Sequence, residues 1–161
     1  MAKSSPSLAV GAALDGRGDL WLAYPADGHL LVSRSGDGGR SFSAAVKVTP
    51  EPEVVTADSE NRPKIVVGAD GIAHVSWTQN LGERMTGYIR HARSTDGGRS
   101  FSVPVTLNSD RQIISHRFDT LATDGRGGVA VAWLDARARS GKVAKGSPET
   151  QVGVYAAVSR D

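Results

Sequence analysis

Short runs of alternating hydrophobic and polar residues follow one another along the chain, separated by turns rich in Gly and Asp. Clear runs cover residues 20–24, 72–77 and 128–133, and an Asp-Gly turn precedes each of them. Alternation with a period of two is typical of a strand with one buried face. An Asp-Gly pair suits a tight hairpin because both positions tolerate a positive φ. No stretch keeps a helical period, so we expect an all-β protein with almost no helix.

The pattern predicts eleven short strands in three repeated groups. They lie near 7–14, 19–24, 29–34 and 44–49, then near 63–68, 72–78, 87–94 and 103–107, and finally near 118–123, 128–134 and 152–158. Four antiparallel strands in each repeat are typical of β-propeller blades. We therefore expect one partial propeller over 1–161, with blades at about 6–50, 61–109 and 115–161, the last without its outer strand.

One turn sequence recurs almost unchanged. Ser-Gly-Asp-Gly-Gly-Arg-Ser-Phe covers 35–42, Ser-Thr-Asp-Gly-Gly-Arg-Ser-Phe covers 94–101, and the chain ends at Asp161 in what reads as the opening of a third copy. This pattern resembles the Asp-box, or BNR repeat, of sialidases and related propellers. The resemblance covers nearly the whole chain and implies a six-bladed sialidase-like propeller, of which this chain supplies about three blades.

The repeated turn has a structural interpretation that does not depend on the family. A short acidic side chain can accept hydrogen bonds from turn amides, the glycines allow the reversed backbone, and the Phe can pack beneath the turn. We therefore expect a structural role, not a catalytic one, for Ser35, Asp37, Gly39 and Phe42 and for Ser94, Asp96, Gly98 and Phe101.

The resemblance also implies what a sialidase site would need. Three arginines hold the substrate carboxylate, a Tyr with a neighbouring Glu acts as nucleophile, and an Asp acts as acid and base. Asn61-Arg62-Pro63 matches the first arginine motif only in part, because the aromatic residue and the Ile are missing. Arg117 takes the equivalent place one blade later. No Tyr–Glu pair is evident, so the catalytic set is incomplete in this chain.

Residues that open the inner strands should lie near the mouth of the central channel. Arg62, His116 and Arg117 are therefore our candidates for contacts with a glycan or a small acidic sugar, since a guanidinium binds a carboxylate well. The alternative is that they form ion pairs between blades, for example with Glu60, Asp119 or Asp135.

Asp135 follows Trp133 at the end of a predicted strand and is the one weak candidate for a catalytic acid. The alternative, which we favour, is a salt bridge between Asp135 and Arg137. Trp77 and Trp133 hold equivalent places in their repeats, and this favours repeated core packing over a sugar-stacking platform.

The composition limits the classes of partner and cofactor that we expect this chain to bind. The net charge is only +2 and the basic residues are scattered, so we expect no nucleic-acid partner. The apolar runs are too short for a membrane span. Cysteine is absent, and the four histidines are dispersed without metal-ligand spacing, so we expect no metal and no cofactor. The resemblance implies an extracytoplasmic or secreted protein, although this chain begins without a signal peptide.

Ring closure leaves two alternatives: the chain is part of a longer propeller, or two copies pair as half-rings. Three functions remain open. The first is a sialidase-like propeller that binds or hydrolyses glycans, the second a non-catalytic binding module, and the third a structural module of a larger exported protein. If either of the first two functions is correct, Arg62→Ala and Arg117→Ala should weaken binding of acidic sugars and leave folding nearly intact.

Overall fold

The computed structural model describes residues 9–137 and 152–160, and in this part of the chain every regular element but a short turn at Arg137 is a β-strand. The first sheet contains β1 (Gly11–Leu14), β2 (Leu20–Ala26), β3 (His29–Ser35) and β4 (Val46–Lys47), in that order. The second contains β5 (Lys64–Val67), β6 (Ala73–Asn80), β7 (Gly87–Ser94) and β8 (Val105–Thr106). The third contains β9 (His116–Thr123), β10 (Val129–Asp135) and β11 (Gly153–Ser159).

Each of the eleven predicted strands is present, and neighbouring strands pair antiparallel throughout. The predicted all-β fold of propeller blades is thereby confirmed. The outer strands β4 and β8 are shorter than expected, with two residues each. Asp161, the last residue of the third repeat, lies outside the described residues.

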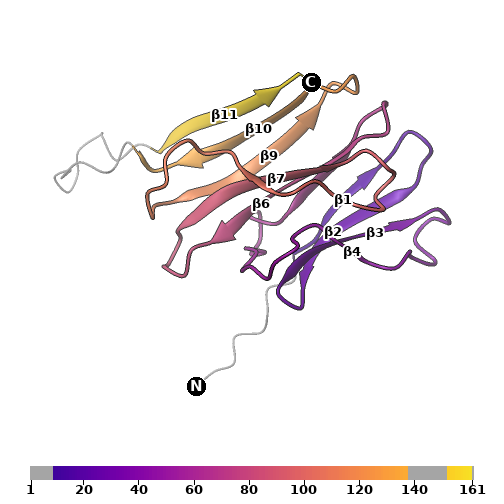
Figure 1. Cartoon of the computed structure of the whole chain (residues 1–161), viewed down its shortest axis with the longest axis horizontal. Coiled ribbons are helices and arrows are strands. Elements are labelled where there is room, and N and C mark those ends of the chain that lie inside the picture. Colours follow the sequence, from indigo (N-terminus) through magenta and orange to yellow (C-terminus); the bar gives the residue numbers. More distant parts are fainter. Residues whose placement is uncertain (1–8, 138–151, 161) are drawn as a thin grey trace.

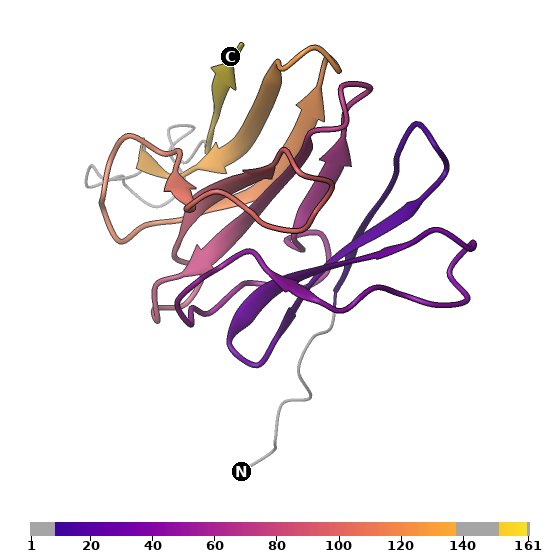
Figure 2. The ribbon, with the colours of Figure 1, turned by 45° about the vertical axis from the view of Figure 1, so that its right-hand side comes forward.

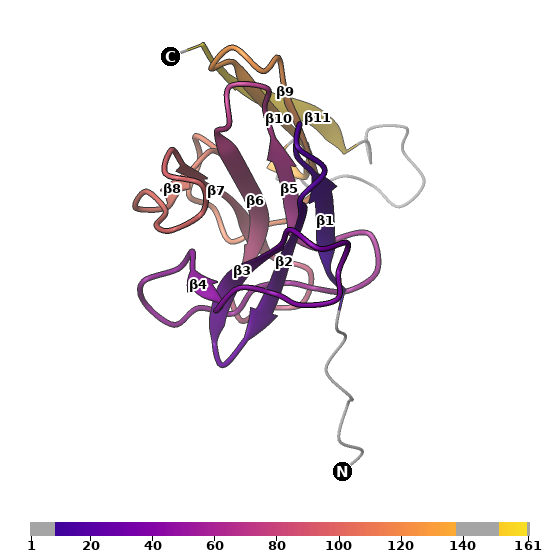
Figure 3. The ribbon, with the colours of Figure 1, turned by 90° about the vertical axis from the view of Figure 1, so that its right-hand side faces the viewer.

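The three sheets are stacked in chain order, with the second between the other two (Figures 1, 2 and 3). The first strand of each sheet contacts the next: β1 contacts β5, and β5 contacts β9. These three strands therefore form the inner edge of the assembly, as first strands do around the channel of a propeller. Residues 9–137 and 152–160 include no helix with the length and apolar character needed to cross a bilayer.

Two hydrophobic clusters hold the sheets together. The larger joins the first and second sheets around Trp21 and Trp77, and the smaller joins the second and third around Ile89 and Trp133. All three tryptophans are buried, which agrees with the core role predicted for Trp77 and Trp133. Each indole N–H donates to a carboxylate: Trp21 to Asp15 at 3.1 Å, Trp133 to Asp135 at 3.0 Å, and Trp77 to Glu53. Burial of these rings therefore leaves no unpaired N–H group.

The two repeated turns, residues 35–42 and 94–101, carry matching hydrogen bonds. Asp37 Oδ1 accepts from the amides of Arg40 and Ser41 at 2.9 Å, and its Oδ2 accepts from the Ser41 hydroxyl at 2.6 Å. Asp96 accepts from the amides of Arg99 and Ser100 and from the Ser100 hydroxyl in the same way. Both carboxylates are thus fully engaged within their own turns.

The Phe residues of the two turns differ from each other. Phe101 packs against the larger cluster, as expected. Phe42 is 43% exposed, which differs from the expected packing beneath its turn. The second turn lies over Trp21 of the preceding sheet, since a Cβ on Gly98 would come within 2.6 Å of that ring. The described residues place no preceding sheet against the first turn, so Phe42 lacks the equivalent cover.

Candidate functional site

The sheet registers place all the candidate site residues at the end opposite the repeated turns. His116 at the start of β9 pairs with Asp135 at the end of β10, whereas Thr123 pairs with Val129 at the other end. Arg62 and Arg117 stand at or near the start of the inner strands β5 and β9. The structure divides these residues between a buried charged cluster, an inter-sheet ion pair and a small inner pocket.

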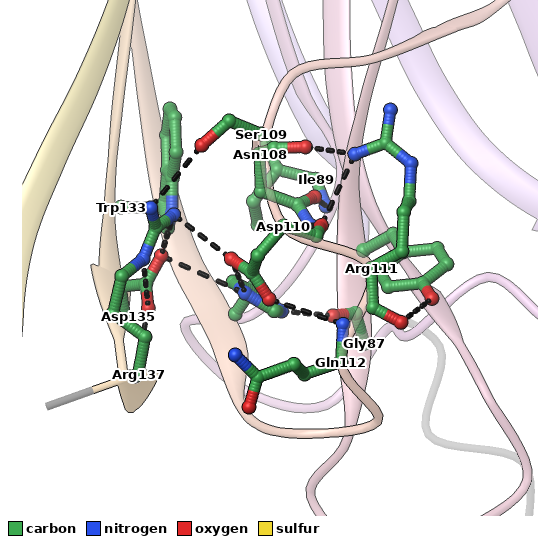
Figure 4. Close-up of polar contacts among 12 residues, drawn as sticks. Gly87, Ile89, Asn108, Ser109, Asp110, Arg111, Gln112, Trp133, Asp135 and Arg137 are labelled. Atoms are coloured by element: carbon green, nitrogen blue, oxygen red, sulfur yellow. Dashed lines mark hydrogen bonds and ion pairs between the residues drawn. The ribbon is translucent and has the colours of Figure 1, made fainter. Parts of the chain in front are cut away.

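The charged cluster consists of Asp110, His116, Asp135 and Arg137 and joins the loop before β9 to the end of β10 (Figure 4). Arg137 Nη2 lies 2.7 Å from Asp135 Oδ2 and 3.0 Å from Asp110 Oδ2. His116 Nε2 lies 3.0 Å from Asp110 Oδ2 and 3.6 Å from Asp135 Oδ2. The sequence pattern could not bring Asp110 into this group, because a loop conformation places it there.

His116 is completely buried and both of its ring nitrogens face acceptors. Nδ1 lies 2.8 Å from the carbonyl oxygen of Gly87, which can only accept, and Nε2 faces the Asp110 carboxylate. Both contacts are hydrogen bonds when the ring carries a proton on each nitrogen. The ring thus links the backbone of β7 at Gly87 to Asp110 in the loop before β9.

Asp135 has no exposed surface, and both oxygens are occupied. Oδ1 accepts from the amide and Nε of Arg137 at 2.9 and 3.0 Å, and Oδ2 accepts from Trp133 and Arg137. Burial acts to raise the pKa of Asp135, but the hydrogen bonds from Arg137 and Trp133 outweigh it and hold the pKa below its usual range. The geometry is that of the Asp135–Arg137 salt bridge, the alternative that the sequence favoured.

Asp110, His116 and Asp135 also offer ligand atoms that all lie within 4.8 Å of one another, a group that could hold a metal ion. The structure supplies the positive charge differently, because the guanidinium of Arg137 contacts both carboxylates. Burial acts to raise the pKa of Asp110, yet hydrogen bonds from His116 and the Gln112 amide lower it overall. The charged cluster is therefore a closed electrostatic contact between two elements.

Arg117 forms the inter-sheet ion pair. Its Nη2 lies 3.1 and 2.9 Å from the two oxygens of Asp58, and the residue is only 7% exposed. This is the blade-to-blade ion pair that the sequence left open, although the partner is Asp58 and not one of the three acids considered. The pairing changes our expectation for Arg117→Ala, which should now affect stability as well as binding.

Arg62, in contrast, is exposed and lies at an inner pocket of about 270 Å³ between β5 and β9. The pocket is lined by Glu60, Arg62, Lys64, Phe118, Asp119 and Thr120. Phe118 is 42% exposed, so an aromatic residue and a guanidinium are both accessible here. The sequence pointed to Arg62 alone; Lys64 and Phe118 were missed, and Asp119 was considered only as an ion-pair partner.

The backbone at Phe118 has an unusual conformation. Its φ is +58°, a region that non-glycine residues rarely adopt, and the β9–β10 register shifts at this point. The shift is a bulge, which turns the following side chains in new directions. Asn61 supports it, because its Oδ1 accepts from the Phe118 amide at 2.8 Å and from the Thr78 hydroxyl at 3.1 Å. Strain of this kind is often found at functional sites.

Asp119 lies within the bulge, between Arg117 and Thr120, which both keep partners on β10, and it is 2% exposed. Its Oδ2 accepts from the Ser76 hydroxyl at 2.5 Å, whereas its buried Oδ1 has no hydrogen-bond partner. Burial raises the pKa of Asp119 above its usual range, although Lys64 and Ser76 act in the other direction. An unpaired buried polar atom costs about 1–3 kcal/mol, so the arrangement is expensive unless a ligand completes it.

Comparisons with known proteins identify the fold. No protein-family model and no curated protein matches the chain. Among solved structures, an α-L-arabinanase of Penicillium chrysogenum, determined with arabinobiose, is 12% identical with a TM-score of 0.63 over 98% of this chain and 47% of its own. A Hadza microbial sialidase, Hz136, is 18% identical with a TM-score of 0.55 over 81% of this chain and 32% of its own.

The NanB sialidase of Streptococcus pneumoniae is 19% identical, with a TM-score of 0.56 over 84% of this chain and 20% of its own. The chain thus spans less than half the length of these solved structures. Together they show a sialidase-like β-propeller fold, which confirms the resemblance drawn from the repeated turns at the level of the fold.

Proposed function

We propose that this chain is a glycan-directed propeller module and that its inner pocket binds an acidic sugar. The observation that carries the proposal is the meeting of exposed Arg62 with the exposed ring of Phe118 in one pocket. A guanidinium holds a carboxylate by charge-assisted hydrogen bonds, and an aromatic face offers an apolar surface to a sugar ring. The solved structures of similar fold lend support, because two of them are sialidases and one is an α-L-arabinanase complexed with arabinobiose.

The charged cluster is the less suitable binding site. His116 and Asp135 have no exposed surface and their polar atoms are engaged within the protein. A ligand there would first have to break the contacts of Arg137 with Asp135 and Asp110. We therefore propose that the charged cluster stabilises this end of the channel and that Arg62 contacts the ligand.

The binding test uses N-acetylneuraminic acid as the acidic probe and galactose as the neutral one, in calorimetric titrations. Arg62→Ala should weaken binding of the acid by roughly ten- to a hundredfold, since a hydrogen bond to a charged group contributes about 1.5–3 kcal/mol. Arg40→Ala is the matched control, because Arg40 is an exposed arginine of the first repeated turn, at the opposite end. Equal titration curves for wild type and Arg62→Ala would rule out this pocket.

Hydrolysis is a second candidate function, favoured by one observation: Glu60 and Asp119, two residues that carry carboxyl groups, line the same pocket. Glycoside hydrolysis commonly uses two such groups, one as acid and the other as base or nucleophile. Release of 4-methylumbelliferone from its sialic acid and arabinofuranose derivatives tests this. Activity that survives in both Glu60→Gln and Asp119→Asn would exclude the pair.

The outer faces of the assembly bear apolar side chains. Val154 and Val158 of β11 are 75% and 65% exposed, and Leu14 of β1 is 68% exposed. We propose that further blades cover these faces, supplied by additional propeller sequence or by a second copy of the chain. Light scattering after size-exclusion chromatography separates the two: a discrete dimer supports paired half-rings, and a monomer supports blades from elsewhere.

A further inference from the structure

We propose that Asp119 binds the acidic sugar directly, as a neutral carboxylic acid that donates a hydrogen bond to the sugar's carboxylate while Arg62 contacts that carboxylate from the pocket rim. This inference rests on the proposed function of the inner pocket. It adds a second recognition residue of a different kind from Arg62, and it makes binding depend on a proton held by the protein.

The hydrogen bonds of Asp119 leave one position open. Its Oδ2 is held by the Ser76 hydroxyl at 2.5 Å, and its Oδ1 is buried with no partner. Asp119 is also one of the residues that line the pocket. Buried polar atoms are nearly always paired in native proteins, so an exception at a pocket points to a partner that arrives with the ligand.

The charges around Asp119 favour its neutral form. Burial raises its pKa more strongly than the attraction of Lys64 and the Ser76 hydroxyl lower it. Lys64 is a weakened counter-charge, because burial lowers its own pKa and its Nζ donates to the backbone oxygens of Glu60 and Arg62.

The remaining charged groups of the surrounding elements do not offer Asp119 a direct partner. Arg117 on β9 is engaged with Asp58, and Asp135 on β10 is engaged with Arg137. On β7, Arg90 donates to Gln79 and Thr106, and His91 stacks on His74 of β6. Of the two charged residues that precede β5 and line the pocket, Glu60 adds a negative charge that further opposes ionisation, whereas Arg62 favours it until an anionic ligand occupies the pocket.

The strained bulge explains why this carboxyl stands where it does. Phe118 at φ +58° takes up the register shift, and Asn61 holds its amide. The bulge leaves the Phe118 ring exposed and the Asp119 side chain buried beside it. A carboxylic acid whose pKa is raised by burial can serve as a hydrogen-bond donor to an oxyanion.

The protonation state of Asp119 determines how the affinity for the acidic sugar changes with pH. Below its pKa, Asp119 is a donor; above it, Asp119 is an anion that repels the sugar's carboxylate. The sugar's own carboxyl stays ionised, because an α-carboxyl has a pKa of about 3.5. Above the pKa of Asp119, binding therefore takes up one proton, and the affinity should fall by up to about tenfold per pH unit in that range.

The experiment measures the affinity for N-acetylneuraminic acid between about pH 5 and pH 8, with its methyl ester as the uncharged match. Wild type should bind the acid more weakly once the pH exceeds the pKa of Asp119, and the trend should be smaller with the ester, which carries no charge to be repelled. Asp119→Asn keeps a neutral donor at every pH, so it should bind with little pH dependence. Asp119→Ala should bind weakly throughout, and thermal melts of both variants establish that they are folded.

The outcomes separate the two proposals. Absence of Arg62-dependent binding of the acid at every pH would overturn the proposed function, and this inference with it. Arg62-dependent binding whose pH trend persists unchanged in folded Asp119→Asn would overturn the role of Asp119 and leave the pocket standing. Loss of the pH trend in Asp119→Asn, with affinity kept, supports the inference, because a purely structural carboxyl would not move that trend.

Discussion

Arg117 and Asp58 join the third sheet to the segment before the second through an ion pair with unequal partners. The Arg117 side chain is 9% exposed, whereas the Asp58 side chain is 55% exposed. The Arg117 guanidinium also lies 5.1 Å from the centre of the Phe118 ring, at the edge of the inner pocket. The buried partner is therefore the Arg117 guanidinium, and the ion pair lies next to the inner pocket at Phe118.

Removal of the Asp58 carboxylate should lower the free energy of unfolding more than the exposure of this side chain suggests. Asp58→Ala leaves a buried guanidinium without its carboxylate, and we expect the free energy of unfolding to fall by roughly 2 kcal/mol. Arg117→Ala leaves an exposed carboxylate that water can solvate, so its cost is mainly lost packing. Urea denaturation measures both, with Glu51→Ala as a control because Glu51 is an exposed acid of the same connection. Equal stability of Asp58→Ala and Glu51→Ala would contradict a structural role for the pair.

Gly98 and Gly39 form a second matched comparison. They hold the same place in the two repeated turns and both have positive φ, +82° and +87°. A Cβ at Gly98 would meet the Trp21 ring at 2.6 Å, whereas at Gly39 the nearest atom is a Leu20 methyl at 3.7 Å. Gly39→Ala should cost about 1–2 kcal/mol from backbone strain alone. Gly98→Ala should cost roughly 1–3 kcal/mol more, because the second turn must move off the first sheet; equal losses in chemical denaturation would refute this packing.

The fold was predictable because its signals are local. An Asp-Gly pair and an alternating run are each complete within a few residues, so the repeats of 20–24, 72–77 and 128–133 indicated the strands β2, β6 and β10 directly. The repeated turns were equally readable, since every hydrogen bond of Asp37 and Asp96 lies within its own turn.

The candidate site was only partly predictable, because its geometry depends on contacts between distant segments. Arg62 and Arg117 occupy equivalent sequence positions, yet one is exposed and the other is buried against Asp58. The surroundings of Asp119 result from a bulge that interrupts the alternation of β9. No sequence signal within residues 116–120 predicts that bulge. Pairing of Asp135 with Arg137 was foreseeable at a separation of two residues, whereas the approach of Asp110 was not.

The stability that Asp37 and Asp96 contribute in the repeated turns should be lost at acid pH. Hydrogen bonds from the Ser41 hydroxyl and amide, and from the Ser35 hydroxyl, lower the pKa of Asp37 from 3.8 to about 2, and matching bonds lower the pKa of Asp96 still further. A lowered folded-state pKa means that the turns stabilise the fold above about pH 4 and lose this contribution as the pH falls toward 2. The melting temperature of wild type should therefore drop over this range more steeply than that of the double variant Asp37→Asn, Asp96→Asn.

The same shift can be followed at a single site. Ser41→Ala removes the hydroxyl that donates to Asp37 Oδ2 but keeps the Ser41 amide, and it should raise the pKa of Asp37 in an NMR titration of its carboxyl carbon. Ser43→Ala is the matched control, because Ser43 accepts from the Arg34 amide and does not contact Asp37. An unchanged Asp37 titration in Ser41→Ala would show that the hydroxyl is not the cause.

Arg137 tests whether the charged cluster is a structural contact. Arg137→Met keeps most of the apolar stem but leaves Asp135, which has no exposed surface, without its guanidinium. Breaking a buried pair in this way typically costs about 3–5 kcal/mol. Arg137→Lys should recover little, because a single ammonium cannot replace the separate contacts of Nε and Nη2 with the two oxygens of Asp135.

The control for Arg137→Met is Arg40→Met, which removes an exposed arginine from the first repeated turn and should change stability little. Combining Arg137→Met with Asp135→Asn should restore part of the loss, because the buried charge that Arg137 neutralises is then absent. Denaturation curves for the four variants decide the matter. If Arg137→Met unfolds at the same urea concentration as Arg40→Met, the cluster does not hold β10 to the loop before β9.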